Sequence, residues 1–353
     1  MRAAYIQRVA TAVPDHNVHH AFVSFAGEAL RESREQALFK RMAERSGIDS
    51  RYSVLSVQAR EHTDDVSAYE WYRERAFPST AERMQLFEQS APILLRRALD
   101  NLNLTSSERQ SIKHVIVTCC TGHYAPGLDF TVIEHLGLDC EASRTMIGFM
   151  GCYAAVNGLR QAQSIVRSAP DESVLLVNLE LCSLHLQETK DLGEMLAFLI
   201  FADGCAATLI SSQKAGFAID SFRSLSIPDS RDLITWRVGN NGFLMHLSGK
   251  VPPAIESFLR EERNALPEAD EIALWAIHPG GKTVLDAVER GLSLTPESLA
   301  ASREVLRRFG NMSSSTVMFV LKDLMQCARS GDRGVAMAFG PGLTAETMRF
   351  HAV

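Results

Sequence analysis

The sequence has no cysteine pattern suited to a metal ion or to a set of disulfides. Its seven cysteines are an odd number, no two of them form a CxxC pair, and no paired histidines accompany them. A disulfide framework uses an even set of cysteines, and a zinc site needs closely spaced ligands. We therefore expect reduced thiols in a cytosolic compartment and no metal site.

Long apolar runs, low-complexity stretches and an excess of positive charge are also missing. No run reaches the roughly 18 apolar residues of a membrane span, and the N-terminal residues lack the apolar core of a signal peptide. The formal net charge of -6 argues against a general nucleic-acid surface. The sequence predicts a cytoplasmic globular protein with no nucleic-acid partner and no stable membrane insertion.

The 353 residues do carry a layered α/β pattern. The chain is 46% hydrophobic and 22% charged, which is enough for a large core in two domains or in one domain with two parts. Short apolar runs alternate with helical patterns and predict buried strands at 114–120, 173–181, 205–212, 272–278 and 334–340. A polar stretch at 211–222 is the softest boundary, so we place an N-terminal half at 1–214 and a C-terminal half at 215–353.

Cys152 lies where an apolar, glycine-punctuated segment changes into a helical pattern. Apolar residues recur there at helical spacing, at Val156, Leu159, Ala162 and Val166. One interpretation is a small, inert core cysteine. The other is that Gly148 and Gly151 form a turn that presents the sulfur at the helix N-terminus, where the helix dipole lowers the thiol pKa and makes it nucleophilic.

Two polar residues of the second half are candidate partners of this thiol. His278 ends a predicted strand, and ligands of α/β sheets gather at such carboxyl ends, although a turn carbonyl could equally satisfy a structural histidine. Asn311 precedes a helical pattern, where asparagine is also a common cap. Together with Cys152 they offer a thiolate and two N–H donors to one carbonyl oxygen, as thioester chemistry requires. A cysteine protease could use the same three residue types.

The sequence around these residues resembles the type III polyketide synthases, the chalcone synthase family. The resemblance covers about Phe39 to the C-terminus, with the motifs in the same order: "LFKRMAERSGIDSRY", "TGHYAPGLDF", "GFMGCYAAVNGLR", "WRVGNNGFLMHLS", "IHPGGKTVLDAVE", "FGNMSSSTVMFVL" and "AFGPGLTAET". It implies a thiolase fold of five αβαβα layers in two duplicated halves, and a homodimer. It also implies an acyltransferase that uses acyl-CoA and malonyl-CoA without a redox cofactor.

The resemblance assigns roles to individual residues. It makes Cys152 the acyl-accepting nucleophile, His278 its activating partner and Asn311 the second donor in decarboxylation. Phe201 matches the residue between the CoA tunnel and the cavity, while Arg41 and Arg45 match positions that hold CoA phosphates. The residues expected to line the cavity are Cys120, Thr121, Cys182, His185, Met245 and Ser313.

Two departures from the plant members concern the cavity. Ala202 replaces a glycine, and Met245 replaces a phenylalanine. Because methionine adapts to irregular apolar ligands, we expect an aliphatic fatty acyl starter, extended and cyclised to a pyrone, resorcinol or phloroglucinol. The alternatives are a ketoacyl synthase III-like enzyme of fatty-acid synthesis, a cysteine hydrolase and a non-catalytic acyl-CoA-binding protein.

Overall fold

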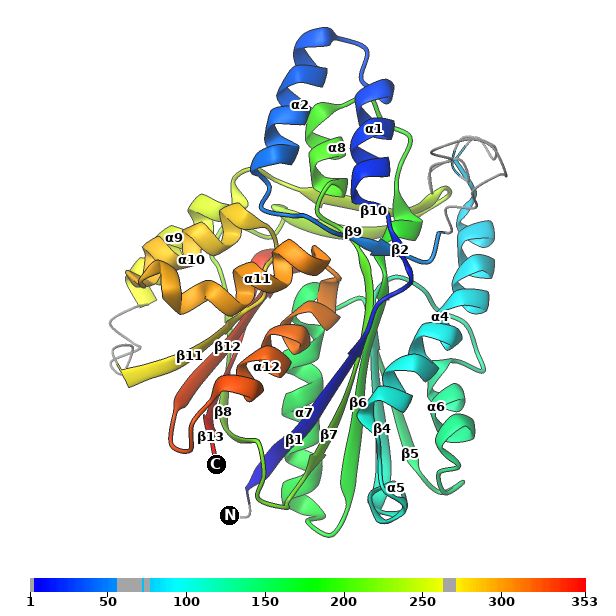
Figure 1. Cartoon of the computed structure of the whole chain (residues 1–353), viewed down its shortest axis with the longest axis vertical. Coiled ribbons are helices and arrows are strands. Elements are labelled where there is room, and N and C mark those ends of the chain that lie inside the picture. Colours follow the sequence, from blue (N-terminus) through cyan, green and yellow to red (C-terminus); the bar gives the residue numbers. More distant parts are fainter. Residues whose placement is uncertain (1–2, 56–71, 73–76, 263–270) are drawn as a thin grey trace.

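A computed structural model describes residues 3–55, 72, 77–262 and 271–353 (Figure 1). Nine strands form a mixed sheet in the order β11-β12-β13-β8-β1-β7-β6-β4-β5. Their bounds are Ala4–Ala12 (β1), Ile112–Cys119 (β4), Ser143–Gly148 (β5), Ser173–Leu181 (β6), Asp203–Ser211 (β7), Phe217–Ser226 (β8), Ile272–Ile277 (β11), Arg333–Gly340 (β12) and Thr344–Ala352 (β13).

The sheet divides into two halves where β1 meets β8. Only the three residues Ala4–Ile6 of β1 pair with β8. Two buried helices, α7 (Ala154–Ser168) and α12 (Thr316–Cys327), pack between the halves and share one apolar core with both (Figure 1). The two half-sheets and this helical layer form the three inner layers of the molecule.

Further helices cover the outer faces of both half-sheets. On the N-terminal half these are α4 (Thr80–Leu102) and α6 (Leu128–Leu136), with the short α5 (Ser106–Ser111) at the start of β4. On the C-terminal half they are α9 (Val251–Glu262) and α10 (Lys282–Leu292), and α11 (Ala300–Phe309) leads back towards α12. A separate apolar core fills each outer gap. The predicted α/β fold with five αβαβα layers is confirmed.

The two halves repeat one topology. In the first half β4 is parallel to β6, β6 is antiparallel to β7, and β7 is antiparallel to β1. In the second half β11, β12, β13 and β8 pair in the same way. A short 3₁₀ helix precedes each central helix, Gly151–Tyr153 (η1) before α7 and Ser313–Ser315 (η6) before α12, and the two are in contact. The repeat therefore brings the N-terminal ends of the two central helices together.

A cap of smaller elements lies above this meeting point (Figure 1). It contains the two-residue strands β2 (His16–Asn17) and β3 (Tyr52–Ser53), the helices α1 (His19–Ala29), α2 (Ser33–Arg45) and α8 (Leu192–Phe198), and the hairpin β9 (Ile234–Gly239) and β10 (Gly242–Leu247). Within the described ranges, no helix combines the length and the apolar character needed to cross a membrane.

The predicted strands are found within two residues of their expected bounds, and the expected helix after Cys152 begins at Ala154. Every apolar position that predicted the face of α7 is fully buried. The expected boundary at 214/215 falls in the connection between β7 and β8, which end and begin at Ser211 and Phe217.

Candidate active site

Cys152 lies in the tight turn that starts the central helix α7. Gly151 has φ +77°, a left-handed conformation that favours glycine, and a Cβ there would come within 2.2 Å of Cδ of Pro341. The Gly151 N–H donates to Sγ of Cys120 at 3.0 Å. The turn is thus fixed from both halves of the molecule, and it leaves the Cys152 side chain partly accessible rather than buried in the core.

His278 follows β11, as predicted, and its backbone N–H donates to the Met337 carbonyl at 2.8 Å. Its side chain is buried, at 1% exposure, yet neither ring nitrogen has a hydrogen-bond partner among the described residues. Buried polar groups are nearly always paired, so an unpaired imidazole indicates a place for a ligand. The alternative of a histidine satisfied by a turn carbonyl is wrong.

Asn311 lies just before η6, and hydrogen bonds of its main chain to the segment 200–202 fix its position. Its N–H donates to the Ile200 carbonyl at 2.7 Å, and its own carbonyl accepts from the Ala202 N–H at 2.9 Å. The side-chain Oδ1 accepts from the Ser313 N–H at 2.9 Å. This turn fixes the carboxamide oxygen and directs the NH₂ group to the cavity, where it donates to the Gly280 carbonyl at 3.4 Å.

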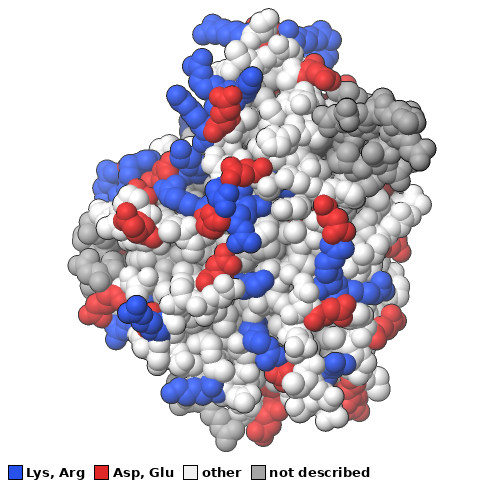
Figure 2. Space-filling model, viewed as in Figure 1, with Lys and Arg blue, Asp and Glu red and all other residues white. Residues whose placement is uncertain are grey.

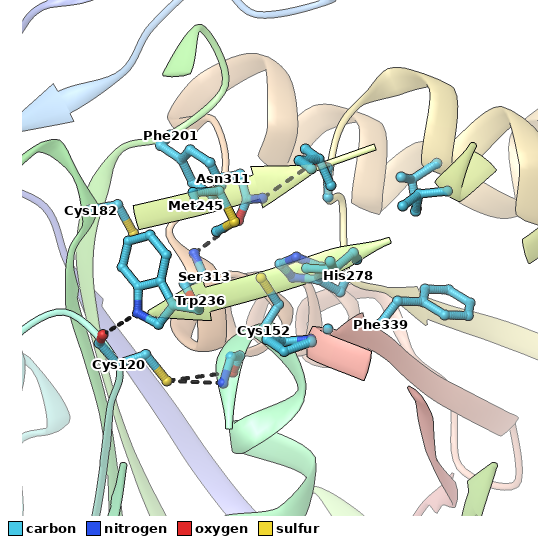
Figure 3. A pocket seen from close by; sticks show the side chains of 18 of the residues that line it. Cys120, Cys152, Cys182, Phe201, Trp236, Met245, His278, Asn311, Ser313 and Phe339 are labelled. Atoms are coloured by element: carbon cyan, nitrogen blue, oxygen red, sulfur yellow. Dashed lines mark hydrogen bonds between the residues drawn. The ribbon is translucent and has the colours of Figure 1, made fainter. Parts of the chain in front are cut away.

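These three side chains line one cavity between the two halves, with about 790 Å³ of empty volume (Figure 3). Most of the wall is apolar, while the polar groups gather around Cys152. Six further sequence-predicted residues line it: Cys120, Thr121, Cys182, Phe201, Met245 and Ser313. Its remaining apolar side chains are Phe198, Ile234, Trp236, Leu247, Val251, Ile255, Val284, Phe339 and Pro341.

His185 lies behind the cavity wall, so its predicted place on the lining is wrong. The ring is fully buried and stacks on Phe243 at a centroid distance of 4.3 Å. Nε2 hydrogen-bonds to the Thr121 carbonyl at 2.6 Å, and Nδ1 accepts from the Phe243 N–H at 3.0 Å. Because main-chain groups engage both nitrogens, this histidine supports the wall and does not face a ligand.

Arg41 and Arg45 are exposed on α2, one turn apart, and neither lines the cavity. Basic side chains gather over this part of the cap (Figure 2). The buried residues of α2 are Phe39 and Ala43. The helix contacts α8, which ends at Phe198 on the cavity wall. The two arginines thus lie on the outside of an element that reaches the cavity, and their contact with CoA stays a prediction.

The remaining apolar wall residues were not predicted, and neither were two residues with polar contacts at the site, Trp236 and Glu180. Trp236 lies on the wall opposite Met245 in the β9–β10 pairing, and its Nε1 donates to the Cys120 carbonyl at 2.8 Å. Glu180 is fully buried behind the wall and accepts from Thr121 Oγ1 at 2.9 Å and from Ser314 Oγ at 2.5 Å. Each had a signal in the sequence. For Trp236 it was a hairpin turn that pairs position 236 with Met245, and for Glu180 it was a carboxylate within an apolar strand.

Known proteins share the whole of this architecture. Residues 3–214 match the N-terminal domain of the chalcone and stilbene synthases, and residues 219–353 match the C-terminal domain. The chain belongs to the chalcone and stilbene synthase family. It is thus a type III polyketide synthase, and its enzyme class is that of acyl-transferring condensing enzymes.

Relatives of this synthase come from several organisms. The alpha-pyrone synthesis polyketide synthase-like Pks18 of Mycobacterium tuberculosis is 33% identical, over 99% of the chain and 91% of Pks18. The type III polyketide synthase domain of Steely1 from Dictyostelium has a TM-score of 0.89 at 25% identity, covering 99% of both chains. The 1,3,6,8-tetrahydroxynaphthalene synthase of Streptomyces coelicolor has a TM-score of 0.84 at 27% identity, covering 98% of this synthase and 99% of that chain.

Burial governs the protonation of the two central groups of the synthase. It raises the pKa of the Cys152 thiol to about 12, against the lowering effect of hydrogen bonds from Ser313 and Asn311. It lowers the pKa of His278 to about 3. The expectation that the helix N-terminus lowers the thiol pKa is therefore wrong, because lost hydration outweighs it. We expect a thiolate to form here when the proton passes to His278, since the two opposite charges would then stabilise each other.

We expect His278→Ala to shift the pH dependence of Cys152 alkylation to higher pH. The thiolate is the reactive form, and without an imidazolium neighbour the thiol keeps the pKa that burial raises. The alkylation rate near pH 7 should fall, and its midpoint should move upward. Iodoacetamide labelling across pH 6 to 10, followed by peptide mass spectrometry, measures this shift.

The matched control is His135→Ala, which removes a histidine that pairs with Asp100 at 2.7 Å on the surface. It should leave the labelling profile unchanged. An unchanged midpoint in His278→Ala would show that this imidazole does not set the state of the thiol.

Proposed function

We propose that this synthase condenses an acyl-CoA starter with malonyl-CoA through an acyl group carried on Cys152. The observation that supports this most is the convergence of an accessible thiol, an unpartnered buried imidazole and an oriented carboxamide in one apolar cavity. The thiol is a nucleophile, and the other two groups are N–H donors for one thioester oxygen.

The first step transfers the acyl group to the enzyme. His278 accepts the proton of Cys152 as Sγ attacks the thioester carbon, so a new C–S bond forms at the protein. The bond to the CoA sulfur breaks, and the departing thiolate takes the proton from His278. The dry, apolar wall limits the access of water to the acyl-Cys152 thioester.

The second step uses the same donors on a different thioester. Malonyl-CoA loses carbon dioxide by cleavage of a C–C bond, and the electron pair becomes an enolate. The negative oxygen accepts hydrogen bonds from the His278 and Asn311 side chains. The enolate carbon then attacks the acyl-Cys152 carbonyl, which forms the new C–C bond and releases the Cys152 thiolate.

The experiment that tests this function is incubation of the pure protein with a panel of acyl-CoAs and labelled malonyl-CoA. We expect release of labelled carbon dioxide, an acyl adduct on Cys152 and products longer than the starter by two-carbon units. Hydrolysis of acyl-CoA without decarboxylation would point to a cysteine hydrolase instead, and binding without an adduct to a non-catalytic protein.

The starter that the cavity suits best is an aliphatic acyl chain. Away from the catalytic groups the wall consists of side chains such as Ile255, Leu247 and Val284, which offer no hydrogen bond. Met245 lies there as well, opposite Trp236 on the hairpin. An apolar, adaptable wall recognises a hydrocarbon chain through burial rather than through polar contacts.

We expect kcat/KM to rise with starter length from acetyl-CoA towards lauroyl-CoA until the cavity is filled. Each buried methylene contributes about 0.8 kcal/mol at most, which corresponds to about fourfold per methylene. Steady-state kinetics over the acyl-CoA series measures this profile. A flat profile, or a preference for coumaroyl- or benzoyl-CoA, would contradict an alkyl pocket. The proposed condensation reaction would be unaffected by that result.

Met245→Trp should move the optimum to shorter starters, because the larger side chain takes up cavity volume. Leu244→Trp is the matched control, since Leu244 is the neighbouring residue on β10, is 45% exposed and does not line the cavity. It should leave the length profile unchanged.

The product we propose is a pyrone, because Pks18 is named for alpha-pyrone synthesis and aligns over nearly the whole chain.

The expected homodimer is a further proposal. β5 is an edge strand, and Met146, Met150 and Phe130 are exposed on or near it, as a surface covered by a second copy would be. A mass in solution of twice 39.0 kDa would support it.

A further inference from the structure

Arg51 lies buried between the cap and the catalytic cavity but does not line that cavity. Its side chain is 2% exposed. Nη1 donates to the Phe201 carbonyl at 2.5 Å and to the Phe198 carbonyl at 3.2 Å, while Nε donates to Nδ1 of His19 at 3.1 Å. The guanidinium also lies over the Phe22 ring, 4.8 Å from its centroid. Arg51 therefore joins the cap helix α1 to the segment that carries Phe201.

The same segment holds Asn311. Residues 200 and 202, on either side of Phe201, make the two main-chain hydrogen bonds to Asn311. The preceding Gly310 has φ +70°, and a Cβ there would come within 2.8 Å of both Cγ of Arg51 and the Ile200 carbonyl oxygen. Arg51 thus packs against the backbone next to Asn311 and also donates to the Phe201 carbonyl in the segment paired with Asn311. A shift of this segment would move the carboxamide.

The other two catalytic side chains depend on different contacts. The turn of Cys152 is held by Sγ of Cys120 and by Pro341, and His278 is anchored to the Met337 carbonyl. None of these contacts involves Arg51. A change at Arg51 should therefore act on one of the three catalytic groups and spare the other two.

We infer that Arg51 is a positioning residue that holds the Asn311 carboxamide in place for decarboxylation of the malonyl thioester. The inference rests on the proposed function, in which Asn311 donates to the enolate oxygen. Catalytic donors act only when they are held close to the productive geometry, and a displacement of about 1 Å costs on the order of 10²-fold in rate.

The test separates the two half-reactions. Acyl loading of Cys152 is followed by intact-protein mass spectrometry, and decarboxylation by release of labelled carbon dioxide from malonyl-CoA. Arg51→Met keeps the length of the side chain and removes its donors. We expect it to lower decarboxylation by about 10²-fold while loading stays close to the wild-type rate. Arg51→Lys keeps one donor group, so it should also lower decarboxylation more than loading, but by a smaller factor than Arg51→Met. It replaces Arg51→Met in the test if that variant does not fold.

The control is Arg83→Met. Arg83 is a second fully buried arginine, and it donates to the carbonyls of Pro78, Leu184 and Leu186 rather than to the segment beside Asn311. It should lower the melting temperature without changing the ratio of decarboxylation to loading. All rates are referred to the folded fraction measured by thermal melting.

A double variant tests the route of the effect. In an Asn311→Ala background, Arg51→Met should lower decarboxylation no further, because the group that it positions is gone. Equal losses in both half-reactions, the same split in Arg83→Met, or additive losses in the double variant would each overturn the inference. A wild-type protein that releases no carbon dioxide, or an Asn311→Ala variant with full activity, would refute the proposed function instead.

Discussion

Replacing Cys152 by alanine is expected to abolish acyl loading and product formation. The loss of a covalent nucleophile costs on the order of 10⁶-fold in enzymes that act through an acyl intermediate. Cys120 and Cys182 line the same cavity, but Cys120 Sγ accepts a hydrogen bond from the Gly151 N–H, and both residues are buried whereas Cys152 is partly accessible. Neither should take over the acyl group. Intact-protein mass spectrometry after incubation with acyl-CoA measures the adduct.

The same variant should still release carbon dioxide from malonyl-CoA, because the donors of His278 and Asn311 remain. This residual activity shows that the protein is folded and binds substrate. Cys140→Ala, which removes an exposed cysteine, should load like the wild type. An alanine variant at Cys152 that forms product at a near wild-type rate would place the nucleophile elsewhere.

Asn311→Ala is expected to lower decarboxylation by roughly 10²–10³-fold and acyl loading much less. Its NH₂ group is needed most when negative charge develops on the malonyl thioester oxygen. During loading, the Cys152 nucleophile and the His278 base are both intact. Release of labelled carbon dioxide and formation of the acyl adduct, measured on the same preparation, give the two rates.

Asn311 also accepts from the Ser313 N–H, so a structural loss has to be separated from a chemical one. Asn311→Asp keeps that acceptor and replaces the NH₂ donor by an oxygen, so it should lose decarboxylation while the melting temperature changes little. Small and equal losses of loading and decarboxylation in both variants would return Asn311 to the role of a turn-forming residue.

Local sequence was sufficient to predict the helices and strands whose burial follows a regular pattern along the chain. β6 is buried along its whole length, and an unbroken apolar run predicts such a strand. The 3.6-residue spacing after Cys152 gave the packed face of α7. The strands β8 and β13 were not predicted, because β8 is buried at one end only and β13 on one face only.

The two histidines show why motif position does not decide the role of a residue. His185 and His278 were both expected in the site. Main-chain groups occupy both nitrogens of His185, whereas those of His278 have no partner among the described residues. The sequence does not contain this difference, because the partners of His185 come from Thr121 and Phe243 on two other segments.

By itself the sequence determined the turn before Cys152, the strand end at His278, the position of Asn311 before a helix and their place in a known family, because each is a local pattern of a few residues. Only the tertiary structure decided which side chains share the cavity. It placed Trp236 opposite Met245 and brought the Arg51 guanidinium to the Phe201 carbonyl, 150 residues away in the chain. It also reversed the expected pKa shift of Cys152, because hydration is lost when two halves of the chain close around a group, and this depends on all of its neighbours at once.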